Sequence, residues 1–266
     1  MDLLLLALVG GVSGVIAGLV GLAGGIVVVP ALTWMYGPSA LHTAIVVSWF
    51  AVLFNSIGAA SKQIRMRSPD ERRALLRGSR WFMLGAVLIT PVIALAASEV
   101  KDVVQPAMVA VLQLCLAAVM LWPMADDAAR ALQPERHRPV VDASFGGLIG
   151  GVSTLIGVGG GTYTIAYFVY GAGSRFRDAI ATANLTGLTV GALSVLGYLA
   201  SLVLFQHPES AHEAGPISTL GMVVLIVAGT AAAPLGVRWS TRLPTKTLRQ
   251  ILIFALMISA GRLLWS

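Results

Sequence analysis

Two glycine-rich stretches carry the residues whose types and spacing are best suited to binding a ligand. They read GLVGLAGGIVVVP at 18–30 and TLIGVGGGTYTIA at 154–166. Each glycine costs a helix roughly 1 kcal/mol relative to alanine, so we expect the backbone to leave the helical conformation in both stretches. Backbone N–H and C=O groups that are not used within a helix need other partners, and a ligand can be that partner.

A helix that begins directly after such a break favours an anionic ligand. If helices begin at Gly25 and Gly161, their free N–H groups and a dipole equivalent to about half a positive charge face the break. No Lys or Arg lies within 3–35 or 143–174, so the backbone itself would supply the positive end of the site. The alternative is that the glycines only allow helices to pack closely.

The composition places both stretches in a membrane. Of the 266 residues, 57% are hydrophobic and 11% are charged, against roughly 25% charged in soluble domains. Apolar runs near the 20 residues that span a bilayer occur at 3–35, 41–61, 80–98, 103–124, 141–170, 179–204, 216–236 and 245–265. We expect an all-α integral membrane protein of eight hydrophobic segments. The first and fifth segments are too long for one crossing and too short for two, which predicts a broken or re-entrant helix in each.

The two long segments also resemble each other. A shift of 136 residues superimposes the following glycines: Gly10, Gly11, Gly14, Gly21, Gly24 and Gly25 on Gly146, Gly147, Gly150, Gly157, Gly160 and Gly161. A shift of 143 superimposes Pro91 and Trp122 on Pro234 and Trp265. We therefore predict two transmembrane repeats of four segments each, 1–124 and 140–266, joined by a cytoplasmic linker at 125–139.

Polar residues at corresponding places follow each glycine stretch. Ser48 and Asn184 are related by the shift of 136 and lie near the start of the next segment. The alternative for such a residue is a hydrogen bond back to its own helix. The predicted substrate-binding residues are Gly21, Gly24, Gly25, Ser48, Gly157, Gly159, Gly160, Gly161, Thr162 and Asn184.

The charged residues predict that the repeats are inverted. The loop 62–80 holds seven Lys and Arg, whereas the corresponding 205–215 holds none and carries Glu209 and Glu213. If the first and fifth segments are re-entrant, both termini lie outside. In that arrangement all Lys and Arg except Lys101 and Arg262 lie on the cytoplasmic side, as the positive-inside rule favours.

Other chemistries lack the residues that they need. The single cysteine excludes a multi-cysteine metal or redox site, and we expect neither a metal nor a cofactor. GVSG at 11–14 matches a short serine-protease motif, but the four histidines lie outside the span interiors and leave the serine without a base. The net charge of +6 comes from short loops between apolar spans, so we expect no nucleic-acid partner. The sequence does not predict an enzyme.

The glycine stretches resemble those of the TauE/SafE family of sulfite exporters, also called the TSUP membrane permeases. The resemblance covers nearly the whole chain, because a pattern like G-x-x-x-G-x-x-G-x-G-G-G followed by Pro recurs in both halves. It is carried by Gly14, Gly18, Gly21, Gly24, Gly25 and Pro30, and by Gly150, Gly157, Gly159, Gly160 and Gly161. Ala23 and Ala166 depart from the pattern.

The resemblance implies a multi-pass protein of the bacterial inner membrane that moves sulfite, a sulfonate or a related small organic anion. We accordingly expect a secondary transporter that works by alternating access, with a small anion and the lipid bilayer as its partners. Two alternatives remain open from the sequence: a non-transporting assembly or accessory protein of the membrane, and an anion channel.

Overall fold

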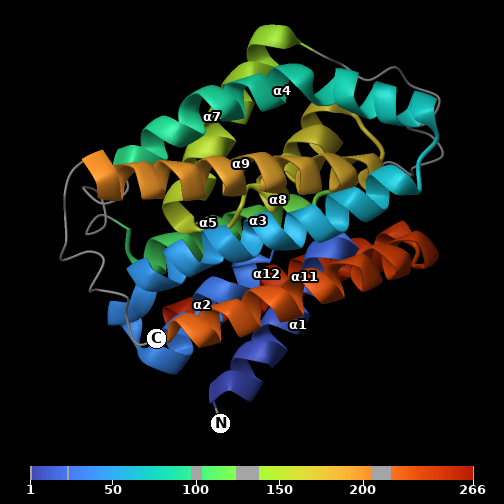
Figure 1. Ribbon diagram of the computed structural model, residues 1–266. Helices are drawn as coiled ribbons and strands as arrows, with labels where there is room; N and C mark the ends of the chain where they lie inside the picture. Colours follow the sequence, from blue (N-terminus) through green and yellow to red (C-terminus); the bar gives the residue numbers. More distant parts are fainter. Residues whose placement is uncertain (1, 23, 97–103, 124–137, 205–216, 266) are drawn as a thin grey trace.

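The protein is a bundle of helices, which a computed structural model describes for residues 2–22, 24–96, 104–123, 138–204 and 217–265. Within these ranges there are helices and no strands (Figure 1). The α-helices are α1 (Asp2–Val20), α2 (Gly25–Tyr36), α3 (Leu41–Arg65), α4 (Pro69–Ala96), α5 (Pro106–Leu121), α7 (Pro139–Ile156), α8 (Gly161–Ala166), α9 (Phe176–Leu204), α11 (Thr219–Arg242) and α12 (Thr245–Leu264). A 3₁₀ turn at Pro38–Ala40 precedes α3, and a π-helix at Tyr167–Ala172 continues α8.

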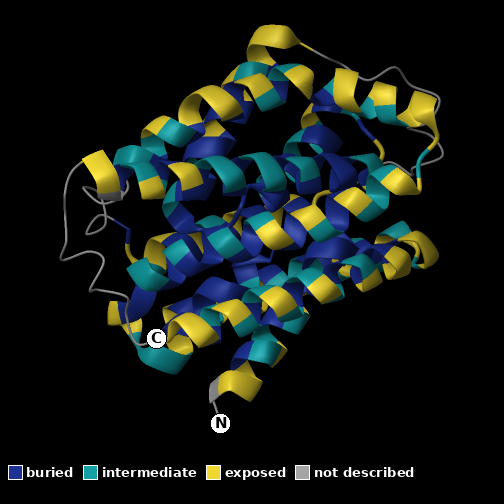
Figure 2. Cartoon of the chain, viewed as in Figure 1, coloured by how far each residue is buried: buried dark blue, intermediate teal, exposed yellow. Residues whose placement is uncertain are grey.

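The outer surface of the bundle is apolar, as a lipid-facing surface must be. In the part of the chain that the structure describes, seven helices are long and apolar enough to cross a membrane, and α2 and α5 are shorter apolar helices. Large side chains such as Leu88, Val203 and Phe254 are exposed on this surface, while buried residues gather where helices face one another (Figure 2). The predicted all-α multi-pass membrane protein is confirmed.

Both long segments are broken at their glycine stretches, as predicted. The first helix of each pair, α1 or α7, stops before the glycines, and α2 or α8 begins after them. The helix starts require left-handed backbone at Gly24 (φ 87°) and Gly160 (φ 74°), which glycine adopts without steric cost. The chain therefore leaves the helical conformation where the sequence is richest in glycine.

The helices can be grouped into two bodies, which are in extensive contact with each other. In the first body, α1 and α3 pack against α11, and α12 packs against α2; in the second body, α7 and α9 pack against α4, and α5 contacts α8. The contacts of α3 with α9 and of α5 with α12 join the two bodies. Figure 1 shows α4 and α7 on one side, α1 and α11 on the other, and α3 and α9 between them. Each body thus combines helices from early and late parts of the chain.

The helices of the first body point in one direction. A Cβ added at Gly10 would meet the backbone of Leu225, and one added at Gly18 would meet the backbone of Ala233. Both positions advance together along the two helices, so α1 runs parallel to α11. Gly58 of α3 lies against the later part of α11, so α3 runs the same way. Because α2 joins the end of α1 to the start of α3, α2 runs in the opposite direction. The first long segment thus turns back on itself, as the re-entrant interpretation requires.

The second body has the same arrangement with the direction reversed. Gly146 lies against Phe82 and Gly151 against Ile93, so α7 runs parallel to α4. Between the bodies, α9 is antiparallel to α3, because Asn184 bonds to Gln63 and Gly191 meets Leu53. These directions are those that an inverted repeat requires. The repeat boundaries at 1–124 and 140–266 stay a prediction, and residues 125–137 of the predicted linker lie outside the described residues.

Several helices, α3, α4, α9 and α11, are longer than the apolar segments that predicted them. The predicted basic loop 62–80 contains the end of α3 and the first turns of α4, which leaves 66–68 between the two helices. In the same way, α11 continues to Arg242 and α12 begins at Thr245. Hydropathy marks the thickness of the hydrocarbon layer, and a helix can continue into the interface on polar and basic residues.

In α1, Gly10 and Gly14 allow close packing against α11, which was the alternative interpretation of these glycines. An added Cβ at Gly14 would overlap the backbone carbonyl of Gly229 in α11, whereas a Cβ at Gly11 would meet nothing within 4 Å. Small residues let the backbones of membrane helices approach in this way.

We expect Gly14→Ala to destabilise the protein by about 1–3 kcal/mol, because the new methyl group forces α1 away from α11. Gly11→Ala is the matched control on the same helix, and it should be neutral or stabilising by up to about 1 kcal/mol, since alanine favours a helix. Thermal unfolding in detergent measures both variants. Equal melting temperatures for the two would contradict the proposed packing role.

Candidate functional site

The two glycine breaks meet each other at the buried centre of the bundle. An added Cβ on Gly25 would overlap the carbonyl oxygen of Gly157, and one on Gly161 would overlap the carbonyl oxygen of Gly21. All four residues are buried. The two contacts are equivalent under the shift of 136, because Gly25 corresponds to Gly161 and Gly21 to Gly157. The predicted glycines of both segments thus contribute to one place.

The helix starts at this place have no side-chain caps. Neither Gly24, before α2, nor Gly160, before α8, offers a side-chain hydrogen bond to the first turn of its helix. The first N–H groups of a helix have no partner within that helix. Gly157, Gly159 and Gly160 are all left-handed, so the second break winds tightly before α8 begins. The N–H groups of both helix starts therefore lie close to where the two segments touch, beside the carbonyl oxygens of Gly21 and Gly157.

Hydroxyl and amide groups surround the first break. Ser48 of α3 donates a hydrogen bond to the carbonyl oxygen of Gly157, which links α3 to the second break. Ser13 of α1 donates to the carbonyl oxygen of Gly24 at 3.1 Å, and Asn55 donates to the Ser13 hydroxyl at 3.0 Å. Ser48 was predicted for the site, but Ser13 and Asn55 were not. An asparagine within an apolar span was the signal that could have identified Asn55.

The second break is flanked by buried polar atoms that have no protein partner. Thr162 in the first turn of α8 and Ser153 in α7 are both 0% exposed, and neither hydroxyl has a hydrogen-bond partner among the described residues. A Cβ on Gly160 would lie 3.1 Å from the Ser153 hydroxyl oxygen. Because a buried polar atom without a partner costs roughly 1–3 kcal/mol, such atoms mark a place where a polar ligand can bind.

Asn184, the counterpart of Ser48 in α9, contacts a different part of the protein. Its side-chain amide donates to the side-chain oxygen Oε1 of Gln63 at 3.2 Å. The Asn184 side-chain oxygen has no hydrogen-bond partner among the described residues. Neighbouring residues of α9 approach the first break, because Ile180 and Ala183 lie beside Gly21. Asn184 therefore lies between the glycine breaks and Gln63.

Gln63 lines a cavity of about 620 Å³. Ile180, which lies against Gly21, lines the same cavity. The cavity is bounded by the end of α3, the start of α4, the start of α9, and the turn between α11 and α12. By the charge distribution of the sequence, this is the side predicted to be cytoplasmic. The cavity is thus separated from the glycine breaks by little more than Gln63, Asn184 and Ile180.

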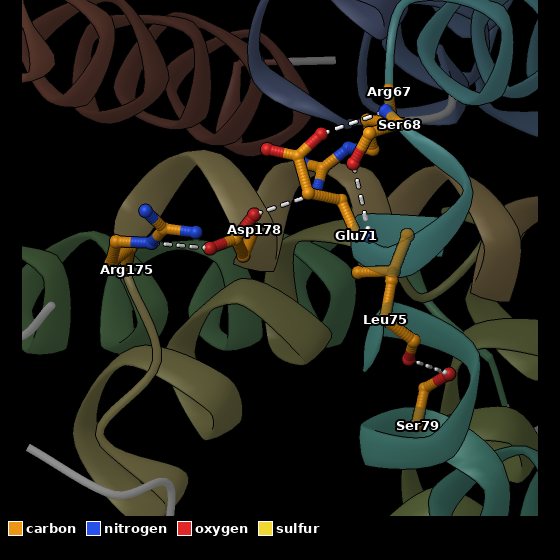
Figure 3. A network of polar contacts seen from close by, with 7 residues as sticks. All are labelled: Arg67, Ser68, Glu71, Leu75, Ser79, Arg175 and Asp178. Carbon is orange, nitrogen blue, oxygen red and sulfur yellow. Dashed lines mark hydrogen bonds and ion pairs between the residues drawn. The ribbon is translucent and has the colours of Figure 1, made fainter. Parts of the chain in front are cut away.

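An ion-pair network lies on the wall of this cavity. Arg67 donates to one carboxylate oxygen of Asp178 at 2.7 Å, and Arg175 donates to the other at 2.6 Å. Figure 3 shows Asp178 between the two guanidinium groups, with Glu71 next to Ser68. From the sequence, the basic residues of 62–80 were expected to orient the protein in the membrane. The Arg67–Asp178 pair joins residues 111 positions apart and has no local sequence signal, whereas Arg175 and Asp178 are only three residues apart.

No basic side chain is buried at the glycine breaks. Among the described residues, Asp142 of α7 is the one charged residue in the buried class. Its carboxylate accepts a hydrogen bond from Tyr167 of the π-helix, on the face of α7 that lines a separate cavity with Tyr163 and Tyr170. In the part of the chain that the structure describes, the breaks therefore offer N–H groups, hydroxyls and amides but no cationic side chain.

Comparison with known proteins agrees with this architecture. A family model described as "Sulfite exporter TauE/SafE" matches residues 6–263. The chain is also similar to a "Probable membrane transporter protein" of Haemophilus influenzae, with 24% identity over 270 residues that cover 97% of this chain and 96% of the relative. No solved structure matches.

Proposed function

Because this chain belongs to the TauE/SafE family, whose members are membrane transporters and not enzymes, we propose that it carries a small anion across the bacterial cytoplasmic membrane. Sulfite, a sulfonate or a related organic anion is the proposed substrate, and the family's description supports that choice. The observation that carries the proposal is the meeting of two interrupted segments at the buried centre, with Gly25 against Gly157 and Gly161 against Gly21.

The proposed site uses the backbone as its positive element. N–H groups at the starts of α2 and α8 would bind the anion, and the hydroxyls of Ser153 and Thr162 would donate to it as well. Ser48, which donates to the carbonyl oxygen of Gly157, would reach the anion only by giving up that hydrogen bond. Hydrogen bonds from neutral groups are weaker than those from Arg or Lys, so the anion can leave as well as arrive. Half-helices that begin at the membrane midplane serve this purpose in other transporter folds.

Alternating access would move the two bodies against each other. The first body supplies Gly25 and Ser48, and the second supplies Gly157, Gly161 and Thr162, so the site lies between them. A rotation about this contact would open the site first towards the cavity beside Gln63 and then towards the opposite side. Relative to the predicted repeats, the bodies exchange α4 and α5 for α11 and α12, so the proposed moving units differ from the repeats themselves.

Purified protein in liposomes should take up sulfite or methanesulfonate with saturation at carrier rates, and the same anions should raise its melting temperature. A ligand present at 100 times its Kd stabilises by about 2.7 kcal/mol. Choline is the control of opposite charge, and it should neither raise the melting temperature nor enter the liposomes. Glycerol is the neutral control, and because it crosses lipid unaided, it should enter at the same rate with and without the protein.

The outcome separates the proposal from its alternatives. Conduction that does not saturate would identify an anion channel. Neither flux nor stabilisation with any anion of the panel would favour an accessory protein and would refute the proposal.

A further inference from the structure

The cavity that opens beside Gln63 has a wall of opposing charges. Three arginines line it, Arg67, Arg175 and Arg177, together with two carboxylates, Glu71 and Asp178. Its lining therefore has one more positive than negative charge. The cavity lies on the side predicted to be cytoplasmic, and Gln63 and Ile180 connect its wall to Asn184 and Gly21.

Asp178 occupies the place of an anion in this cavity. Its two carboxylate oxygens accept from Arg67 at 2.7 Å and from Arg175 at 2.6 Å, so each oxygen is held by a different guanidinium group. The Arg67 and Asp178 side chains are 19% and 16% exposed, and Arg175 is 49% exposed. Charge-assisted hydrogen bonds of this kind are about twice as strong as neutral ones.

The other charged groups of the cavity are engaged elsewhere. Glu71 accepts from the backbone N–H of Ser68 at 2.8 Å, within the first turn of α4. Arg177 donates to the backbone carbonyl of Leu243 at 3.0 Å. Asp178 is thus the carboxylate that joins Arg67 and Arg175, as Figure 3 shows.

We propose that Arg67 and Arg175 form a capture site for a small oxyanion, such as sulfite or a sulfonate, which binds them in exchange for the Asp178 carboxylate. A sulfonate or sulfite group presents oxygen acceptors to a guanidinium fork as a carboxylate does. Arg175 is half exposed, so it can meet the incoming anion before the more buried Arg67 releases Asp178. This inference rests on the proposed function, because it assigns the first binding step of the same transport path.

The exchange also loosens a contact between the two bodies. Arg67 lies in the turn between α3 of the first body and α4 of the second, and Asp178 lies in the first turn of α9. Their ion pair fixes this turn to α9 at the mouth of the cavity. An anion that replaces Asp178 removes that connection beside Gln63 and Ile180, which lie on the way to the glycine breaks.

Equilibrium binding of sulfite in lipid nanodiscs tests the capture site. Arg67→Gln and Arg175→Gln should each weaken binding by about 10- to 100-fold, the loss of one charge-assisted hydrogen bond. Asp178→Asn should strengthen binding by about tenfold, since it removes the competing carboxylate. The matched control is Arg73→Gln, which removes a charge from the same basic region but pairs with Asp70 away from the cavity, and binding should change by less than about twofold.

Two further variants keep the test decisive. Arg67→Lys retains the charge and the ion pair but loses the planar fork, so it should fold normally and still bind sulfite about tenfold more weakly. In Gly161→Leu, which fills the glycine break, sulfite should still bind with the same dependence on Arg67 and Asp178. Loss of all binding in that variant, or equal affinities in every arginine and aspartate variant, overturns the capture site.

Flux measurements on the same variants separate the two proposals. If the wild-type protein binds sulfite in this arginine-dependent way but transports nothing, the capture site stands and the proposed function fails. If transport is saturable but equal in Arg67→Gln, Arg175→Gln and Asp178→Asn, the proposed function stands and the capture site fails.

Discussion

Gly25→Leu and Gly161→Leu are each expected to abolish anion transport while the protein still inserts into the membrane. The side chain added at Gly25 would be driven into the carbonyl of Gly157, and the one at Gly161 into the carbonyl of Gly21. The two breaks would have to move apart. The N–H groups at the starts of α2 and α8 would then no longer face the same binding site. Overpacking strain of about 3 kcal/mol at the site corresponds to a loss of roughly 100-fold or more.

The measurement is uptake of sulfite into proteoliposomes, with membrane fractionation as the test of insertion. Gly11→Leu is the matched control, because it adds the same side chain to α1 at a position where a Cβ meets nothing within 4 Å. Transport in Gly11→Leu should stay within about twofold of the wild type. Normal uptake in both Gly25→Leu and Gly161→Leu would remove the central site.

Trp49→Ala is expected to cause the largest loss of stability among single substitutions in the bundle. Trp49 of α3 is 2% exposed, donates its indole N–H to the carbonyl oxygen of Thr154 at 2.9 Å, and packs edge-on against Tyr198. It therefore connects α3 to α7 and α9 next to Ser48. Lipid is as apolar as the bundle interior, so the loss comes from the cavity and the missing dispersion contacts, about 3 kcal/mol or more.

Two substitutions separate packing from hydrogen bonding in thermal unfolding experiments. Trp49→Phe keeps most of the ring volume and removes the indole donor, so it should cost about 1 kcal/mol. Trp239→Ala is the control, because Trp239 is 52% exposed and its loss should change the unfolding free energy by less than about 1 kcal/mol. A control variant as unstable as Trp49→Ala would show that tryptophan loss acts through lipid contact instead of bundle packing.

The helix breaks were predictable because glycine acts through local backbone preferences. Left-handed backbone at Gly24 and Gly160, and helix starts at Gly25 and Gly161, follow directly from the residues at those positions. Hydropathy likewise predicted the spans, but it placed the end of α3 too early and the start of α4 too late. Both helices continue on residues that lie outside the hydrocarbon layer.

Contacts between residues far apart in the sequence could not be predicted from it. The shift of 136 related Gly21 to Gly157 and Gly25 to Gly161, but internal similarity does not reveal that Gly25 touches Gly157 and that Gly161 touches Gly21. It also paired Ser48 with Asn184, yet Ser48 bonds to Gly157 whereas Asn184 bonds to Gln63. The same limit applies to the cavity, because the contact of Arg67 with Asp178 depends on how α3, α4 and α9 pack.

The pairing of α1 with α11 has a consequence for how the protein is made. The contact of Gly10 with Leu225 joins residues far apart in the sequence, so α1 leaves the ribosome well before α11 and must wait for it. At 5–20 residues per second, that interval is roughly 10 to 40 s. During that interval, the face of α1 that carries Gly10, Gly14 and Gly18 contacts lipid or a membrane chaperone in place of α11. A nascent chain that stalls before residue 219 is then exposed to quality-control proteolysis.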